Sequence, residues 1–148
     1  MGAGAHDIFD DPSGAEPATP GSYGQAPSGF RLPGGTHLGR VVLQVSSLDT
    51  SLAFYQEVLG FRLVTRDAAQ ASLAAQGDDR PIVELRERPG ARSVPRRGAF
   101  GLYHFAILLP NRASLGRFVR HLTDIGVRAG AGDHLVSEAF YLQDPDNL

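Results

Sequence analysis

Apolar and polar positions follow the same order twice along the chain, over residues 40–63 and again over 104–128. Each copy opens with an apolar run typical of a buried strand. A capping residue follows, and apolar residues then recur at the three- and four-residue spacing of an amphipathic helix. Each copy ends in glycine, an apolar residue and arginine. Such a repeat predicts a duplicated supersecondary unit, with a ligand site in the concave surface between the halves.

The same periodicities predict the individual elements of each copy. In the first copy we expect a strand near 39–46, a helix near 48–59 and strands near 61–66, 70–75 and 82–87. In the second we expect a strand at 102–109, a helix at 112–124, strands near 126–130 and 135–142, and a turn at 144–147. The predicted fold class is therefore α+β, with paired βαβββ modules forming a curved mixed sheet around a cleft.

The module boundaries follow from these elements: module one at about 37–88, a linker at 89–101 and module two at 102–148. Because a Pro-Asp-Asn turn after an apolar strand predicts a returning strand, we interpret the second module as lacking its last strand and the sequence as truncated. The folded domain is expected at 36–148. Residues 1–35 are rich in Gly, Ala, Pro and Ser, which predicts a disordered tail, although a partner-binding segment has the same composition.

Composition narrows the classes of function. The net charge of −2 gives no support for nucleic-acid binding, which needs a positive excess. The chain has no cysteine, so disulfides, thiol catalysis and cysteine metal sites are excluded. It has neither a signal peptide nor a long apolar stretch, so no membrane insertion is expected and a cytoplasmic location is the default. An unpaired apolar strand at 135–142 would be a template for association with another chain, for example in a homo-oligomer.

Strand alternation brings forward two polar residues at matching positions of the copies. On the predicted strand 102–109, His104 points away from the helix, toward the inner face of the sheet. Arg40 occupies the same face at the start of the first predicted strand. Two polar side chains aimed at one cleft indicate a site for a metal or for acid–base chemistry. The alternative is a hydrogen-bonded core histidine and an arginine at the rim.

A second pair of candidates lies near the end of the chain. His134 stands where a glycine-rich loop enters a predicted strand, and Tyr141 lies seven residues later. Imidazole titrates near neutral pH, and a tyrosine hydroxyl can donate to a developing oxyanion, so the pair suits proton transfer. A purely structural role for both residues is the alternative.

Four segments resemble the vicinal oxygen chelate superfamily of glyoxalases, bleomycin resistance proteins and extradiol dioxygenases, most closely its catechol 2,3-dioxygenase branch. They are GRVVLQV at 39–45, SLAFY with VLGF at 51–61, GLYHFAILLP at 101–110 and DHLVSEAFYLQDPD at 133–146. The resemblance implies paired βαβββ modules and, in catalytic members, Fe(II) or Mn(II) held by two histidines and a carboxylate, with an aromatic substrate and O2. It implies that His104 is a metal ligand, His134 the active-site histidine and Tyr141 a hydrogen-bond donor close to the metal site.

This chain departs from the family pattern at two ligand positions. Arg40 stands where the first histidine is expected, and a guanidinium only donates hydrogen bonds, so it cannot coordinate a cation. The carboxylate would lie beyond Leu148. The resemblance therefore implies either part of a catechol-cleaving dioxygenase that holds its metal in the complete protein, or a metal-free module that sequesters a small molecule. In the second case Arg40 pairs with an anionic or phenolate ligand.

Overall fold

The computed structural model describes residues 28–33, 36, 38–93, 95, 101–135 and 137–148. It divides into two compact units. We call Leu38–Val127 with Gln143–Leu148 the sheet unit, and the described residues up to 36 with Arg128–Leu142 the hairpin unit. The predicted disordered tail falls mostly outside the described residues, and its described part, 28–33, is exposed and forms neither helix nor strand. No helix in the described part of the chain is long and apolar enough to cross a membrane.

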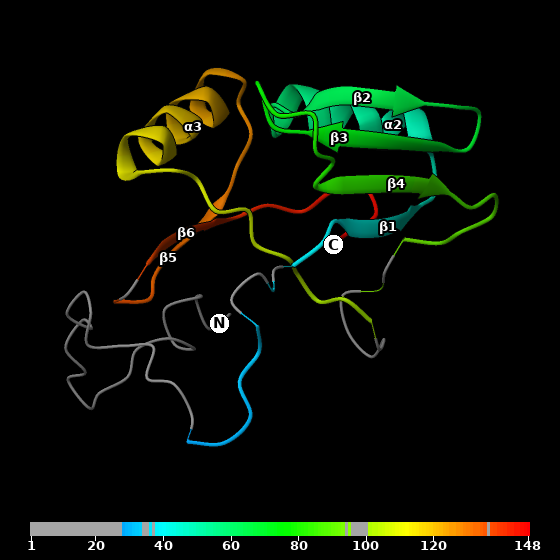
Figure 1. Cartoon of the computed structure of the whole chain (residues 1–148). Coiled ribbons are helices and arrows are strands. Elements are labelled where there is room, and N and C mark those ends of the chain that lie inside the picture. The colour runs from blue at the N-terminus through cyan, green and yellow to red at the C-terminus, as the bar shows by residue number, and fades with distance from the viewer. Residues whose placement is uncertain (1–27, 34–35, 37, 94, 96–100, 136) are drawn as a thin grey trace. The chain divides into compact units, whose positions relative to one another are not determined.

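The sheet unit is built on one mixed sheet of four strands (Figure 1). The strands are β1 (Val41–Val45), β2 (Arg62–Arg66), β3 (Gln70–Ala74) and β4 (Val83–Glu87), in the spatial order β1-β4-β3-β2. β1 runs parallel to β4, whereas β3 is antiparallel to both β4 and β2. The α+β class and the βαβββ order of the first module are thus confirmed, with every strand end within two residues of the predicted one.

One face of this sheet is covered by the helix between β1 and β2. The helix begins as α2 (Leu48–Ala53) and continues as a π-helical turn, η1 (Phe54–Val58). Its inward side chains recur at helical spacing, and alternate residues of the strands meet them. The buried apolar core consists of Leu43, Val45, Leu48, Leu52, Tyr55, Phe61, Ala71, Leu73, Val83 and Leu85.

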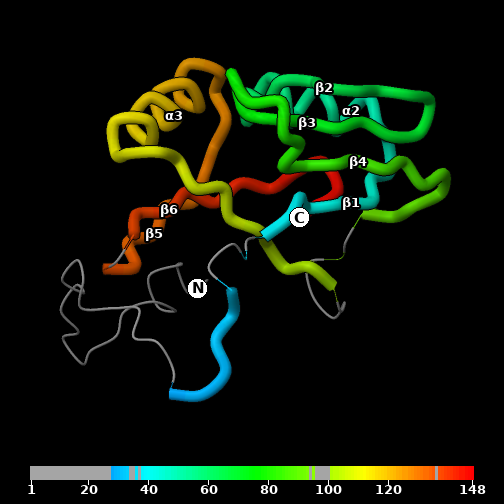
Figure 2. Tube along the Cα trace, viewed as in Figure 1, coloured from blue at the N-terminus to red at the C-terminus, as the bar shows by residue number. Residues whose placement is uncertain are grey.

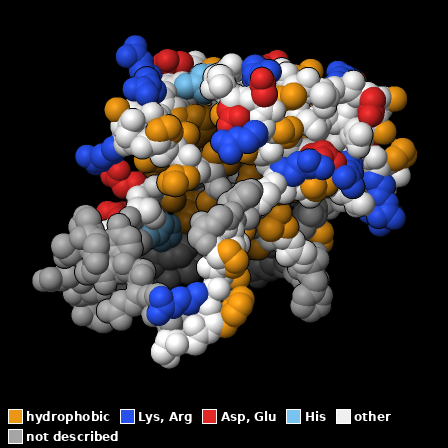
Figure 3. Space-filling view, in the orientation of Figure 1, with side chains coloured by type: hydrophobic (Ala, Val, Ile, Leu, Met, Phe, Trp, Pro, Cys, Tyr) orange, Lys and Arg blue, Asp and Glu red, His pale blue; other side chains and the backbone are white. Residues whose placement is uncertain are grey.

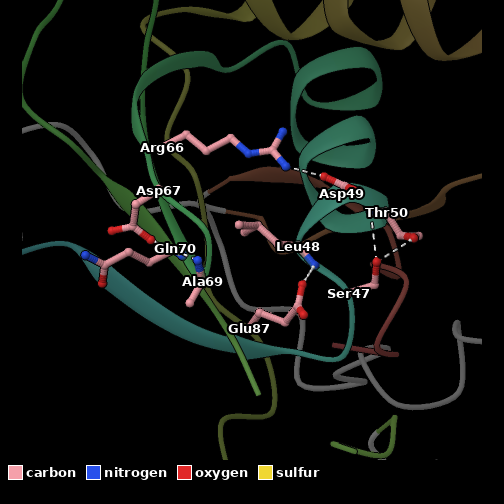
Figure 4. Close-up of polar contacts among 9 residues, drawn as sticks. All are labelled: Ser47, Leu48, Asp49, Thr50, Arg66, Asp67, Ala69, Gln70 and Glu87. Atoms are coloured by element: carbon pink, nitrogen blue, oxygen red, sulfur yellow. Dashed lines mark hydrogen bonds and ion pairs between the residues drawn. The ribbon is translucent and has the colours of Figure 1, made fainter. Parts of the chain in front are cut away.

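Polar groups cap the start of this helix, and a glycine follows its end. The Ser47 hydroxyl accepts from the backbone N–H of Thr50, and the carboxylate of Glu87 accepts from the N–H of Leu48 at 2.7 Å (Figure 4). Because Glu87 ends β4, it ties the helix start to the sheet. The helix stops before Gly60, whose φ of 76° suits a residue without a Cβ.

The second copy of the repeat keeps its helix with the same kind of caps. In α3 (Arg112–Asp124), the Asn111 side chain accepts from the N–H of Ser114 at 2.9 Å. The helix ends at Asp124, and the N–H groups of residues 126 and 127 bond back to the carbonyls of residues 123 and 122 in a Schellman arrangement. The ring of His121 lies 2.9 Å from the backbone oxygen of Glu57, joining α3 to η1.

The predicted strand at 102–109 does not form. Residues 102–109 form neither helix nor strand, and in Figure 2 the tube for these residues does not join the sheet. Of the described strands, none pairs with it, and an apolar pattern makes a strand only where a neighbouring backbone accepts and donates its hydrogen bonds. The alternation persists in part: Phe105 packs against the core, whereas His104 and Leu108 are exposed.

The hairpin unit contains two short antiparallel strands. These are β5 (Gly130–Asp133) and β6 (Glu138–Tyr141), with Gly130 opposite Tyr141 and Asp133 opposite Glu138. The prediction placed the first strand at 126–130, which was wrong because Gly126 and Val127 complete the α3 cap. The second lies inside the predicted 135–142, since Leu135 has a φ of 65° and belongs to the turn.

Candidate functional site

The face of the sheet away from α2 carries polar side chains. Register fixes this, because residues paired across strands point the same way. Leu43 pairs with Leu85 on the buried face, while Val42 pairs with Glu84 and Gln44 with Arg86 on the other. We call the second set, together with the preceding Arg40, the open face. Figure 3 shows basic and acidic side chains gathered side by side at the level of β4.

A buried carboxylate between two arginines is the main feature of the open face. Glu84 Oε2 lies 2.6 Å from Arg40 Nε, and Oε1 lies 2.6 Å from Arg86 Nε and 2.5 Å from its Nη2. The Glu84 side chain is 7% exposed, whereas those of Arg40 and Arg86 are 50% and 54% exposed. The arrangement fixes both guanidinium groups at the surface and leaves the cluster with one net positive charge.

Sequence reasoning placed Arg40 on this face but missed its partners. The available signal was the alternation of 83–87, in which an acid lies between two buried apolar residues. Only the parallel pairing of β1 with β4 brings Glu84 next to Arg40.

His104 lies in the irregular segment 101–109 of the sheet unit. Its ring packs edge-on against that of Tyr103, with centroids 5.4 Å apart. The expectation that a strand would present this histidine to the sheet is therefore wrong, because no strand forms there. Its role as a metal ligand stays a prediction.

His134 and Tyr141 meet in the hairpin unit. His134 Nε2 lies 2.7 Å from the Tyr141 hydroxyl, and the rings are nearly perpendicular. The register explains the contact: Tyr141 is opposite Gly130, and the turn after β5 folds His134 back over Gly132. A methyl group at Gly132 would stand 3.4 Å from both rings. The structure thus places the two residues of this candidate pair in direct contact, at a distance suited to proton exchange.

A second polar cluster, which sequence reasoning missed, lies inside the sheet unit. The C-terminal segment returns to β1, where Asp146 Oδ2 accepts from the N–H of Ser46 at 2.9 Å (Figure 2). The Tyr55 hydroxyl donates to Asp144 Oδ2 at 3.2 Å, and Asp144 Oδ1 accepts from the N–H groups of Asp146 and Leu148. These hydrogen bonds hold the turn predicted at 144–147 against the core.

Burial raises the pKa of two members of this cluster, Asp144 and Tyr55. Desolvation raises the pKa of Asp144, opposed by the hydrogen bonds it accepts, and the charge of Asp146 raises it further. Desolvation and the Asp144 carboxylate also raise the pKa of Tyr55, so its hydroxyl stays protonated. One oxygen of Asp146, Oδ1, is buried without a hydrogen-bond partner among the described residues.

The described residues do not fit the divalent metal that the resemblance implies. They contain no group of three histidine or carboxylate side chains able to hold an ion. At the position of the first ligand, Arg40 is a fixed cation bound to Glu84, and its charge opposes a metal ion. The open face therefore presents two arginine side chains in place of metal ligands.

Comparison with known proteins agrees with the architecture. Residues 37–148 match the model of the Glyoxalase/Bleomycin resistance protein/Dioxygenase superfamily. Over 111 residues the chain is 48% identical to a catechol-2,3-dioxygenase from Bacillus subtilis (strain 168). The aligned region covers 75% of this chain and 39% of that protein. The chain thus spans about two fifths of the length of this relative.

Solved structures show the same fold at low identity. A glyoxalase/dioxygenase from Nostoc punctiforme has a TM-score of 0.61 at 20% identity, covering 82% of this chain and 93% of that one. A glyoxylase/bleomycin resistance protein/dioxygenase domain from Frankia sp. EAN1pec has a TM-score of 0.60 at 23% identity, covering 76% and 92%. With the family model matching three quarters of its length, this chain belongs to the glyoxalase/bleomycin resistance protein/dioxygenase superfamily.

Proposed function

We propose that this chain is a module pair of an extradiol dioxygenase, whose complete form uses a divalent metal, Fe(II) or Mn(II), to cleave a catecholic ring with O2. The observation that carries the proposal is the 48% identity to the Bacillus catechol-2,3-dioxygenase over 111 residues. Because the chain spans 39% of that relative, the activity is proposed for the complete polypeptide. No metal ligand set is assigned to the open face, where Arg40 and Arg86 are fixed cations.

Within this proposal, His134 is an acid–base group and Tyr141 its hydrogen-bond donor. The 2.7 Å contact between them supports the pairing, since a neighbouring hydroxyl fixes the orientation of the imidazole ring. Neither role needs a residue of the open face.

The test is ring cleavage by the polypeptide encoded by the complete gene, loaded anaerobically with Fe(II). Catechol and substituted catechols are added with O2, and the absorbance of the ring-fission product is followed. We expect turnover, and we expect His134→Gln and Tyr141→Phe to lower kcat by about a hundredfold, the usual size of an acid–base contribution.

His121→Gln is the matched control, because that histidine bonds the backbone of η1. If no ring-fission product forms from several catechols at full iron occupancy, ring cleavage is contradicted. Turnover that is unchanged in both His134→Gln and Tyr141→Phe would overturn their assignment alone.

A second function, metal-free binding of a small anion, is favoured by one specific observation. Arg40 replaces a metal ligand and is held at the surface by the buried Glu84. A binding module needs no metal, so the complete polypeptide would contain no stoichiometric iron or manganese. Stoichiometric metal that disappears in His104→Ala would contradict this alternative.

A further inference from the structure

The open face has unused hydrogen-bond donors beside its buried acid. Arg40 gives only its Nε to Glu84, and Arg86 gives its Nε and Nη2. In the described part of the chain, the remaining guanidinium nitrogens of these two arginines make no hydrogen bond. Both side chains are about half exposed, and their contacts with Glu84 hold the two guanidinium groups at the sheet. Such fixed, planar donors suit a carboxylate.

The apolar residues next to the arginines complete the chemistry. Val42 is paired with Glu84 in the register, and its side chain is exposed. Ile82 is exposed and lies two residues before Glu84, so the two side chains share a face of the sheet. The carbonyl of Ile82 accepts from the N–H of Val41, which places Ile82 beside Arg40. An apolar surface between two cations matches a flat apolar group that carries one negative charge. The single net positive charge of the cluster balances a monoanion better than a phosphate dianion.

We propose that the open face binds an aromatic monocarboxylate, with its carboxylate on the free N–H groups of Arg40 and Arg86 and its ring over Val42. The inference deepens the metal-free binding function, for which it names the ligand class. It does not depend on ring cleavage, because binding needs neither metal nor O2. Glu84 positions the two arginines and at the same time limits the affinity by its own negative charge.

The test is calorimetric titration of the full 148-residue chain with benzoate, at neutral pH and low ionic strength. Benzamide has the same shape without the charge, and phosphate has charge without the ring. We expect benzoate to bind at least about tenfold more tightly than either. We expect Arg40→Gln and Arg86→Gln each to weaken benzoate binding by about tenfold, the size of one charge-assisted contact.

Glu84→Gln makes the prediction of opposite sign. It keeps an acceptor for the arginines and removes the competing charge, so it should tighten benzoate binding several-fold, by about the effect of one nearby charge. This variant keeps the proposal testable if loss of an arginine unfolds the sheet unit. Arg66→Gln is the matched control, since Arg66 pairs with Asp49 at the start of α2 (Figure 4).

Nuclear magnetic resonance locates the site. Benzoate should shift the backbone amides of residues 42, 84 and 86 first. Equal binding of benzoate and benzamide would overturn the proposal, as would equal binding of phosphate, weaker binding by Glu84→Gln, or shifts confined to other residues. None of these results bears on ring cleavage, which is measured separately with catechol and Fe(II).

Discussion

Individual polar residues of this chain take their properties from burial. Asp144, Asp146 and Glu84 are all nearly buried, yet they differ in what surrounds them. Glu84 is compensated by two arginines, whereas Asp144 has neutral donors on one side and another acid nearby. Burial and a nearby acid favour the protonated form of Asp144. The two sites should therefore respond differently to mutation.

At Asp144 we expect a contribution to the free energy of unfolding that changes with pH. Its pKa is higher in the folded than in the unfolded chain, so folding favours the protonated acid. This contribution is present below the ordinary carboxyl pKa and is lost as pH rises through the raised folded pKa. Asp144→Asn should therefore gain stability relative to the wild type as pH increases from about 4 to 7.

The measurement is urea unfolding at several pH values across that interval. Asn keeps an oxygen for the N–H groups of Asp146 and Leu148, which makes the substitution conservative. Asp124→Asn, on the surface of α3, is the matched control for the loss of one carboxylate. A difference for Asp144→Asn that stays constant with pH would contradict the account.

At Glu84 the expected effect is a loss of folding stability. Glu84→Ala leaves Arg40 and Arg86 facing each other without the carboxylate that separates them. Because both arginines are half exposed and remain solvated, we expect a cost of about 1–3 kcal/mol. Glu84→Gln should cost less, since the amide oxygen still accepts. Urea denaturation at neutral pH checks both, and equal stabilities of the wild type and Glu84→Ala would show that the pair contributes nothing.

At the scale of elements, the first module is held by contacts from strand ends to helix ends. Glu87, the last residue of β4, accepts from the first N–H of α2, and Arg66, the last residue of β2, pairs with Asp49 in the first helical turn (Figure 4). The N-terminal N–H groups of a helix have no partner within it, so a carboxylate there satisfies a donor and opposes the helix dipole. These contacts join the start of the covering helix to two strands, β4 and β2.

We therefore expect Glu87→Ala to destabilise the sheet unit by about 1–2 kcal/mol, the typical range for losing a charged helix cap. Glu87→Gln should recover part of the loss, because its oxygen can accept from Leu48. Thermal unfolding followed by circular dichroism gives the comparison. A melting temperature unchanged in Glu87→Ala would mean that Ser47 alone caps the helix.

The second copy shows how an element depends on its neighbours. Its helix forms with the predicted bounds because Asn111 and Gly126 cap it locally. The segment 102–109 has an equally clear pattern but no strand beside it among the described ones, and its large side chains at Tyr103 and Leu108 remain exposed. A helix satisfies its own backbone, whereas a strand needs another segment.

For the whole molecule, the donor set predicts weak metal binding by this chain. Among the described residues no three ligands converge, and Arg40 is a fixed cation. We expect the purified 148-residue chain, dialysed against Fe(II) or Mn(II), to retain much less than one ion per chain. Elemental analysis measures it.

His104→Ala is the informative variant for the same measurement. If the chain retains metal and this substitution removes it, His104 is a ligand and our account of the donor set is wrong. If wild type and variant are equally free of metal, the residue has another role in this chain.

Local chemistry in the sequence determined much of this protein. The periodicities specified the helices near 48–59 and 112–124, their Ser and Asn caps, and the individual strands of the first module, because these depend on residues close in sequence. The family also followed from local motifs. His134 and Tyr141 were identified as candidates because each residue type suits proton transfer by itself.

Tertiary structure decided what depends on pairing between distant segments. The parallel register of β1 with β4 brought Glu84 to Arg40, and the returning C-terminal segment brought Asp144 to Tyr55. The 102–109 pattern gave no strand because no described strand accepts it. Partners across 40 or 90 residues leave no periodic signal in one sequence, so the charge and hydrogen-bond state of these groups emerged only with the fold.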